Sequence, residues 1–245
     1  MLNLYTWSTQ NARKISIMLK ECDLSYKITP INIEQGEHHT LDFKTLNPNS
    51  KIPVLLDSDL LDEQGQPVRI FETGAILLYL AEKTGRFIPK SPAQRYNVIK
   101  WLFWQTSNLG PVFGNFSHFA SALVQDKTKL NPYLAQSRAS EPNHYSIERF
   151  TKESFRLLHV MESVLAERAY IADEQITIAD FACYTWIESA WAGFSQINPE
   201  IQQQFQHISS WMKKLADRPR VRAGMNQLAW GADLSQEQTA LTTQS

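Results

Sequence analysis

The chain has 245 residues, 43% of them hydrophobic, which is enough to bury one core or two. Its 24 basic and 25 acidic residues are scattered and give a formal net charge of -1, so no basic stripe is available to neutralise nucleic-acid phosphates. No apolar run reaches the roughly 18 residues that a membrane-spanning helix needs, and residues 1–20 lack the apolar stretch of a signal peptide. We therefore expect a cytoplasmic protein that binds neither nucleic acid nor membrane.

The first quarter of the chain begins with a predicted βαβ unit. Residues 2–7 alternate like a strand, and the polar turn at 8–11 follows. Apolar residues then recur at helical spacing from Ile15 to Cys22. Residues 26–33 predict a second strand, which should lie parallel to the first because a helix is the usual crossover between them.

A hairpin and a helix complete this predicted domain. Residues 52–57 and 68–71 have strand character and are separated by a turn-rich segment at 62–66. The helix opens at Glu72-Thr73-Gly74 and carries an apolar face. The order βαβ-ββα is therefore complete within residues 1–84, an α/β domain.

The hydrophobic pattern of the sequence changes after a predicted linker at 85–92. This linker combines glycine and proline without periodicity. Residues 93–230 are helical in pattern and predict an all-α domain. Within it, the proline-containing interval 126–143 predicts a loop or lid. Residues 231–245 predict a polar tail that frays.

Cysteine and histidine spacing argues against a metal centre. The two cysteines, Cys22 and Cys183, form no CxxC or zinc-ligand pattern. The six histidines include the neighbours His38 and His39, but none has HExxH spacing. We predict no metal cofactor, and we expect both cysteines to be buried and inert because they lie among apolar residues.

Ile52-Pro53 stands at the start of a predicted strand, where proline cannot donate to the sheet. A cis peptide bond there would turn the backbone N–H and C=O of Ile52 outward, where an extended peptide could pair with them. An ordinary trans proline is the competing interpretation, since only about 5–6% of X–Pro bonds are cis. The motif becomes informative only together with others.

Glu72-Thr73 is a second motif of this kind, at the start of the last predicted helix of the α/β domain. A hydroxyl and free N–H groups at a helix N-terminus bind an anion, and the neighbouring carboxylate can hold an ammonium group. The pair therefore suits the zwitterionic end of an amino acid. A simple helix cap at Thr73 explains the same residues equally well.

These motifs together resemble the glutathione transferases. Residues 51–53 and, about twenty residues later, the segment 71–80 (FETGAILLYL) resemble the two glutathione-binding segments of that family. Residues 176–181 (ITIADF) look like the capping box and hydrophobic staple of its helical domain, in which Thr177 and Asp180 cap each other. The resemblance covers nearly the whole chain and implies a thioredoxin-like N-terminal domain followed by the all-helical C-terminal domain.

The loop at residues 8–11 and the stretch from Trp101 to Pro111 resemble the nu-class and bacterial disulfide-bond oxidoreductase branch. In that branch a threonine and an asparagine two positions apart lie near the glutathione sulfur, which implies catalytic roles for Thr9 and Asn11. Tyr5 and Ser8 remain alternatives, because other classes activate the thiol with tyrosine or serine.

The resemblance also implies which residues bind the rest of glutathione. His38 stands where this branch places a polar residue, usually glutamine, against the glycyl end, and a solvated loop histidine is the competing interpretation. Arg149 resembles an arginine that reaches a glutathione carboxylate, and an exposed helix charge is the alternative. The implied glutathione-binding residues are His38, Lys51, Ile52, Pro53, Glu72, Thr73 and Arg149.

The proposed chemistry needs a thiolate. A free thiol with a pKa of about 8.5 is only about 3% ionised at pH 7, and lowering that pKa by two units takes about 2.7 kcal/mol. A hydroxyl and an amide that donate to sulfur at a helix N-terminus can supply this stabilisation. The nucleophile is then the sulfur of the ligand, and the protein needs no cysteine of its own.

We therefore expect a glutathione-dependent enzyme that reduces disulfides and more weakly conjugates small electrophiles or reduces peroxides. The resemblance implies a homodimer. One rival is a conjugation-dominant transferase of another class that uses Ser8 or Tyr5. The other is a non-catalytic glutathione-binding regulatory protein with the same fold.

Overall fold

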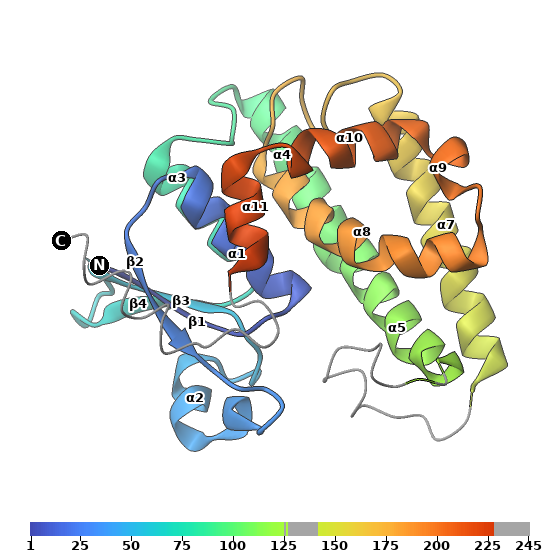
Figure 1. Ribbon diagram of the computed structural model, residues 1–245. Coiled ribbons are helices and arrows are strands. Elements are labelled where there is room, and N and C mark those ends of the chain that lie inside the picture. Colours follow the sequence, from blue (N-terminus) through green and yellow to red (C-terminus); the bar gives the residue numbers. More distant parts are fainter. Residues whose placement is uncertain (125, 127–141, 228–245) are drawn as a thin grey trace. The chain divides into compact units, whose positions relative to one another are not determined.

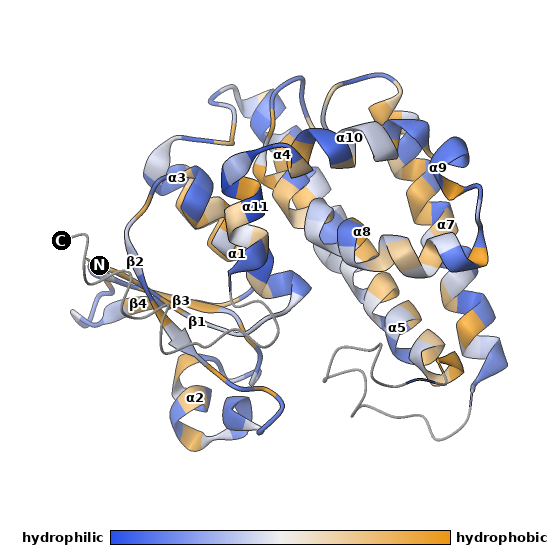
Figure 2. Cartoon of the chain, viewed as in Figure 1, coloured by the Kyte–Doolittle hydropathy of each residue, from blue (hydrophilic) through white to orange (hydrophobic). Residues whose placement is uncertain are grey.

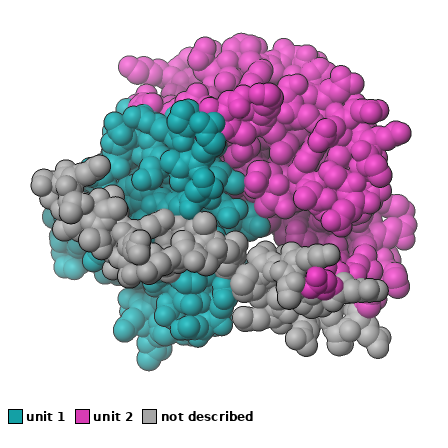
Figure 3. Space-filling view, viewed as in Figure 1, with its two compact units in different colours: residues 1–84, 219–245 teal, residues 85–218 magenta. Residues whose placement is uncertain are grey.

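The computed structural model describes residues 1–124, 126 and 142–227 (Figure 1). The chain forms two compact units, one of residues 1–84 and 219–245 and the other of residues 85–218 (Figure 3). The predicted loop at 126–143 lies almost wholly outside the described residues. The predicted tail at 231–245 lies entirely outside them.

The first unit is built on a four-stranded mixed sheet in the order β2-β1-β3-β4. Strand β1 runs parallel to β2 and antiparallel to β3, and β3 runs antiparallel to β4. This is the predicted βαβ-ββα arrangement, so the α/β fold class is confirmed. The strands are β1 (Leu2–Thr6), β2 (Tyr26–Pro30), β3 (Val54–Leu61) and β4 (Pro67–Ile70).

Helix α1 buries the apolar face that its sequence predicts. Ile15, Met18 and Leu19 are fully buried because they recur at helical spacing on one side. The helices of this unit are α1 (Gln10–Glu21), the single turn η1 (Glu37–His39), α2 (Leu41–Leu46), α3 (Thr73–Thr84) and α11 (Pro219–Asn226).

Helix α11 packs on α1 and therefore belongs to the first unit, although the sequence grouped residues up to 230 with the helical domain. A glycine allows this close approach. A Cβ atom on Gly224 would lie 2.5 Å from the Cα atom of Ile17, a distance that no side chain tolerates. Local sequence does not reveal this contact, because α1 and α11 are about 200 residues apart.

The second unit consists of helices whose polar and apolar residues alternate along their length (Figure 2). A π-helical segment, absent from the sequence prediction, joins two of them at Gln105–Leu109. Among the described residues, no helix is long and apolar enough to cross a membrane. The elements are α4 (Pro92–Trp104), η2 (Gln105–Leu109), α5 (Gly110–Ala120), η3 (Ser121–Leu123), α7 (His144–Leu165), α8 (Ile178–Ile197), α9 (Ile201–Gln204) and α10 (Gln206–Ala216).

Aromatic rings fill the core of the second unit. The ring centroid of Phe194, on α8, lies 4.6 Å from that of Phe116 and 5.1 Å from that of Phe113. Its ring also packs against the ring of Phe155 on α7. Such pairs contribute beyond their buried area. The predicted capping box is confirmed at the start of α8, where the Thr177 side chain caps the helix and Asp180 accepts from the Thr177 N–H at 2.8 Å.

Candidate active site

Strand register brings three predicted segments to one end of the sheet. Tyr5 of β1 pairs with Val54 of β3, so the loop after β1 leaves the sheet beside the segment that enters β3. Leu55 of β3 pairs with Ile70 of β4, which places the start of α3 next to that same segment. The segments that contain Thr9, Ile52-Pro53 and Glu72-Thr73 therefore converge, although up to 64 positions separate them in sequence.

Thr9 is the N-cap of α1. Its hydroxyl oxygen accepts from the Ala12 N–H at 3.2 Å, and the Arg13 N–H donates to its carbonyl at 3.0 Å. Because the hydroxyl oxygen acts as the acceptor, its hydrogen can be donated to a ligand. No acidic residue lies in the first turn of α1, so the partial positive charge of this helix end is not neutralised there.

Asn11 lies in the same first turn, two residues after Thr9, and is half-buried. The two alternative thiol-activating residues lie nearby in the chain. Tyr5 is half-buried within β1. Ser8 is 4% exposed, and its hydroxyl has no hydrogen-bond partner among the described residues.

The Ile52–Pro53 peptide bond is cis, as the sequence left open. The preceding loop is held by the buried side chain of Asn47, whose amide donates to the Lys51 carbonyl at 2.7 Å and whose oxygen accepts from the Asn49 N–H at 2.9 Å. Lys51 is exposed. The loop therefore exposes a charged side chain, while its backbone is held in place by the hydrogen bonds of the buried Asn47 side chain.

Glu72 and Thr73 begin helix α3 with an unusual backbone. Glu72 has a φ of 68°, in the left-handed region, and its carbonyl accepts from the Ile76 N–H at 3.0 Å. A non-glycine residue in this region is strained, and such strain often accompanies binding sites. The Glu72 side chain is exposed while Thr73 is 8% exposed, so a carboxylate and a hydroxyl belong to adjacent residues at a helix N-terminus.

Sequence reasoning missed Lys14. This residue is 1% exposed within α1, and its Nζ atom donates to the Thr73 hydroxyl oxygen at 3.2 Å. A signal was available in the sequence, because Lys14 stands four residues before Met18 on an otherwise apolar stripe. Long charged residues are almost never fully buried without a partner.

His38 lies in the single turn η1, beyond the end of β2. Its Nδ1 atom is buried without a hydrogen-bond partner among the described residues. Burial lowers the pKa of His38, and the neighbouring His39, whose ring centroid is 3.9 Å away, lowers it further. At neutral pH the ring is therefore uncharged and can hydrogen-bond as a neutral donor or acceptor.

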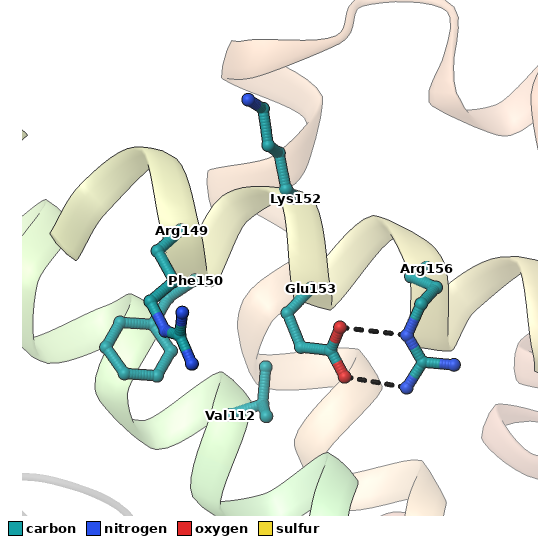
Figure 4. A pocket seen from close by; sticks show the side chains of 6 residues that line it. All are labelled: Val112, Arg149, Phe150, Lys152, Glu153 and Arg156. Carbon is teal, nitrogen blue, oxygen red and sulfur yellow. Dashed lines mark hydrogen bonds and ion pairs between the residues drawn. The ribbon is translucent and has the colours of Figure 1, made fainter. Parts of the chain in front are cut away.

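Arg149 belongs to the other unit, on helix α7, and is exposed. It lines an open pocket of about 610 Å³ between α5 and α7 (Figure 4). Within that pocket the Arg156 guanidinium makes two hydrogen bonds to the Glu153 carboxylate, at 2.8 and 2.6 Å. The remaining lining residues are Val112, Phe150 and Lys152.

Both cysteines are buried, as predicted from their apolar surroundings. The Cys22 sulfur lies 3.5 Å from the Thr84 hydroxyl. In the part of the chain that the structure describes, no group of three or more histidine, cysteine, aspartate or glutamate side chains is placed to hold a metal ion.

Comparison with known families and proteins assigns both halves of the chain. Residues 1–82 match the family described as glutathione S-transferase, N-terminal domain, and residues 127–219 match its C-terminal domain. A curated relative, disulfide-bond oxidoreductase YfcG of Escherichia coli, is 34% identical over 219 residues, which cover 89% of this chain and 92% of the relative.

Solved structures show the same fold. A glutathione transferase from Burkholderia graminis, solved with two glutathione molecules per subunit, is 33% identical with a TM-score of 0.78 over 94% of this chain and 89% of the other. One from Pseudomonas putida, solved with one glutathione disulfide per subunit, is 32% identical with a TM-score of 0.78 over 91% of this chain and 90% of the other.

Proposed function

Since the chain is a member of the glutathione S-transferase family, we propose that it uses bound glutathione to reduce disulfides and, more weakly, to conjugate small electrophiles or reduce peroxides. The observation that carries this proposal is the Thr9 cap. Its hydroxyl oxygen accepts from the first turn of α1, which leaves a hydroxyl hydrogen at an electropositive helix end. Such a donor suits a thiolate.

Thr9 and Asn11 would stabilise the glutathione thiolate in this scheme. The thiolate attacks one sulfur of the disulfide substrate, a mixed disulfide forms, and the other sulfur leaves as a thiol after taking up a proton. A second glutathione then attacks the glutathionyl sulfur of the mixed disulfide. The products are glutathione disulfide and the second substrate thiol, so two glutathione molecules are oxidised for each disulfide reduced.

The rest of glutathione would bind along the sheet end. The backbone of Ile52 would pair with the cysteinyl residue, in the manner of an added strand. Glu72 and Thr73 would hold the ammonium and carboxylate of the γ-glutamyl group. His38, Lys51 and Arg149 would contact the rest of the tripeptide, whose one remaining carboxylate, at the glycyl end, suits a neutral imidazole donor and cationic side chains.

Substitution of the two thiol-stabilising residues tests the proposal. If Thr9→Ala and Asn11→Ala each remove about one unit of the pKa shift, the thiolate fraction at pH 7 falls about 3-fold in each variant and about 25-fold in the double variant. Disulfide turnover and the ultraviolet absorbance of the bound thiolate should fall together. The acid limb of the pH–rate profile should move to higher pH.

The rivals give different results in the same assay. Disulfide turnover that survives the double substitution but is lost in Ser8→Ala or Tyr5→Phe would favour a transferase of another class. The buried hydroxyl of Ser8, which has no hydrogen-bond partner among the described residues, makes Ser8→Ala the sharper test of the two. Glutathione affinity without turnover of any disulfide, peroxide or aromatic halide would favour a regulatory protein.

We further propose a cytoplasmic homodimer. Tyr96 and Phe103 are 70% and 67% exposed on α4 and stand seven residues apart, so they share one helix face. Large exposed aromatics on one face are typical of interfaces. Sedimentation should show a dimer that dissociates when both are changed to serine, whereas a monomeric wild-type protein would contradict this assignment.

A further inference from the structure

A buried lysine stands behind the segment proposed to bind the γ-glutamyl group. Lys14 is 1% exposed, and its Nζ atom lies 3.2 Å from the Thr73 hydroxyl oxygen. Removing an ammonium group from water is costly, so a lysine at this depth is held by partners, and Thr73 is one of them. The contact joins α1 to the first residue of α3.

The direction of this hydrogen bond determines what Thr73 can do. A protonated lysine can only donate, so the Thr73 oxygen must be the acceptor. The hydroxyl hydrogen then has to point to a different acceptor. A hydroxyl that accepts from a cation also becomes a stronger donor, because consecutive hydrogen bonds polarise one another.

The surroundings of Thr73 favour an anionic acceptor. The Ile76 N–H is the donor that bonds to the Glu72 carbonyl, which marks Glu72 as the residue that precedes the helix. The first N–H groups of α3 therefore lack partners within the helix. A buried cation, a directed hydroxyl and a helix N-terminus all point to a carboxylate at this position.

We propose that Lys14 is a positioning residue that makes the site selective for ligands with a free α-carboxylate at their γ-glutamyl end. It acts through Thr73 by fixing the direction of the hydroxyl and by adding positive charge behind it. This inference rests on the proposed glutathione site. It assigns to Lys14 no contact with the reacting sulfur.

A positioning role and a purely structural role of Lys14 predict different affinities for two ligands, and a second lysine serves as the control. Calorimetry would compare glutathione with 4-aminobutanoyl-cysteinylglycine, which lacks only the α-carboxylate, in the wild type, in Lys14→Met and in Lys14→Arg. Lys27→Met is the matched control, because Lys27 is exposed on β2 of the same unit. Circular dichroism and thermal melting would check that each variant folds.

Lys14→Met should weaken glutathione binding about 10-fold or more, since hydrogen bonds that involve charge are the stronger class. Its affinity for the decarboxylated analogue should stay within about 2-fold of the wild type, and Lys14→Arg should recover part of the loss. In turnover, KM for glutathione should rise while kcat at saturation is kept. Lys27→Met should change neither ligand.

Equal weakening of both ligands in Lys14→Met, or no weakening of glutathione, would overturn the inference. A wild type that binds both ligands equally would also overturn it while leaving the proposed function intact. A wild type that binds neither ligand would instead defeat the proposed function itself. If Lys14→Met does not fold, Lys14→Gln, which keeps a donor but loses the charge, supports the same comparison.

Discussion

Thr9 and Thr177 both cap helices in this protein, and their surroundings differ. Thr177, which caps α8, accepts from the Ala179 N–H at 3.3 Å and donates its own hydroxyl hydrogen to Asp180 at 3.0 Å. Thr9, which caps α1, accepts from Ala12 but donates to no acceptor among the described residues. The third helical position holds an aspartate in α8 and an alanine in α1.

This difference separates a folding element from a ligand site. The carboxylate of Asp180 neutralises the positive end of α8 and uses the donor capacity of its cap, which leaves nothing for a ligand. The end of α1 keeps both its charge and a donor. The same cap residue therefore stabilises structure in one place and is available for chemistry in the other.

Removing the carboxylate of Asp180 should have the largest effect on stability. This fully buried group also accepts from the Ile171 N–H and the Trp211 ring N–H, both at 2.9 Å. We expect Asp180→Ala to lower the free energy of unfolding by about 3–5 kcal/mol, because several buried donors lose their acceptor at once. Denaturant unfolding measures this loss. A change below about 1 kcal/mol would contradict the role given to Asp180 as the acceptor that completes the cap of α8.

A second buried carboxylate that accepts several hydrogen bonds, Asp57 in the first unit, should make stability depend on pH in acid. Burial by itself raises the pKa of Asp57, but hydrogen bonds from Lys83, Tyr79 and the Asp59 N–H outweigh it and hold the pKa at about 2. Because the folded-state pKa is depressed, the stabilisation is present above the unfolded-state pKa of 3.8 and is lost as pH falls towards 2.

The loss should amount to about 2 kcal/mol between about pH 4 and pH 2. Urea unfolding of the wild type and of Asp57→Asn over that range measures it, with the variant expected to show the shallower pH dependence. Equal slopes for the two proteins would show that the Asp57 network contributes nothing in acid.

Matched substitution of the two caps should give the smallest stability change and the clearest contrast in function. Thr9→Ala and Thr177→Ala should each lower the free energy of unfolding by about 1 kcal/mol, the usual value of a cap. Only Thr9→Ala should also raise the pKa of the bound glutathione thiol. A rise of similar size in the thiol pKa of Thr177→Ala would contradict the functional distinction between the Thr9 cap and the Thr177 cap, whose hydroxyl already donates to Asp180.

Local sequence carried most of the fold. The alternation in β1 and the helical spacing of Ile15, Met18 and Leu19 predicted their elements, because each pattern reflects one buried face. The capping box of Thr177 and Asp180 was predictable for the same reason, since its partners are three residues apart. The π-helical segment at Gln105–Leu109 was not, because no local pattern distinguishes it from an α-helix.

The proposed site divides in the same way. Thr9, Asn11, Ile52-Pro53 and Glu72-Thr73 were recognisable as short motifs, and strand register then explains why their segments meet. The bond between Lys14 and Thr73 was not recognisable, because its partners are 59 residues apart and lie on different helices.

By itself, the sequence determined which segments become strands, helices and caps, and which family motifs the chain carries, because those properties depend on neighbours a few positions away. Only the tertiary structure decided that Gly224 lets α11 pack on α1 and that the charge of Lys14 is buried behind Thr73. Contacts of this kind depend on how folded elements pack in space. The spacing of residues along the chain does not show which distant elements will come into contact.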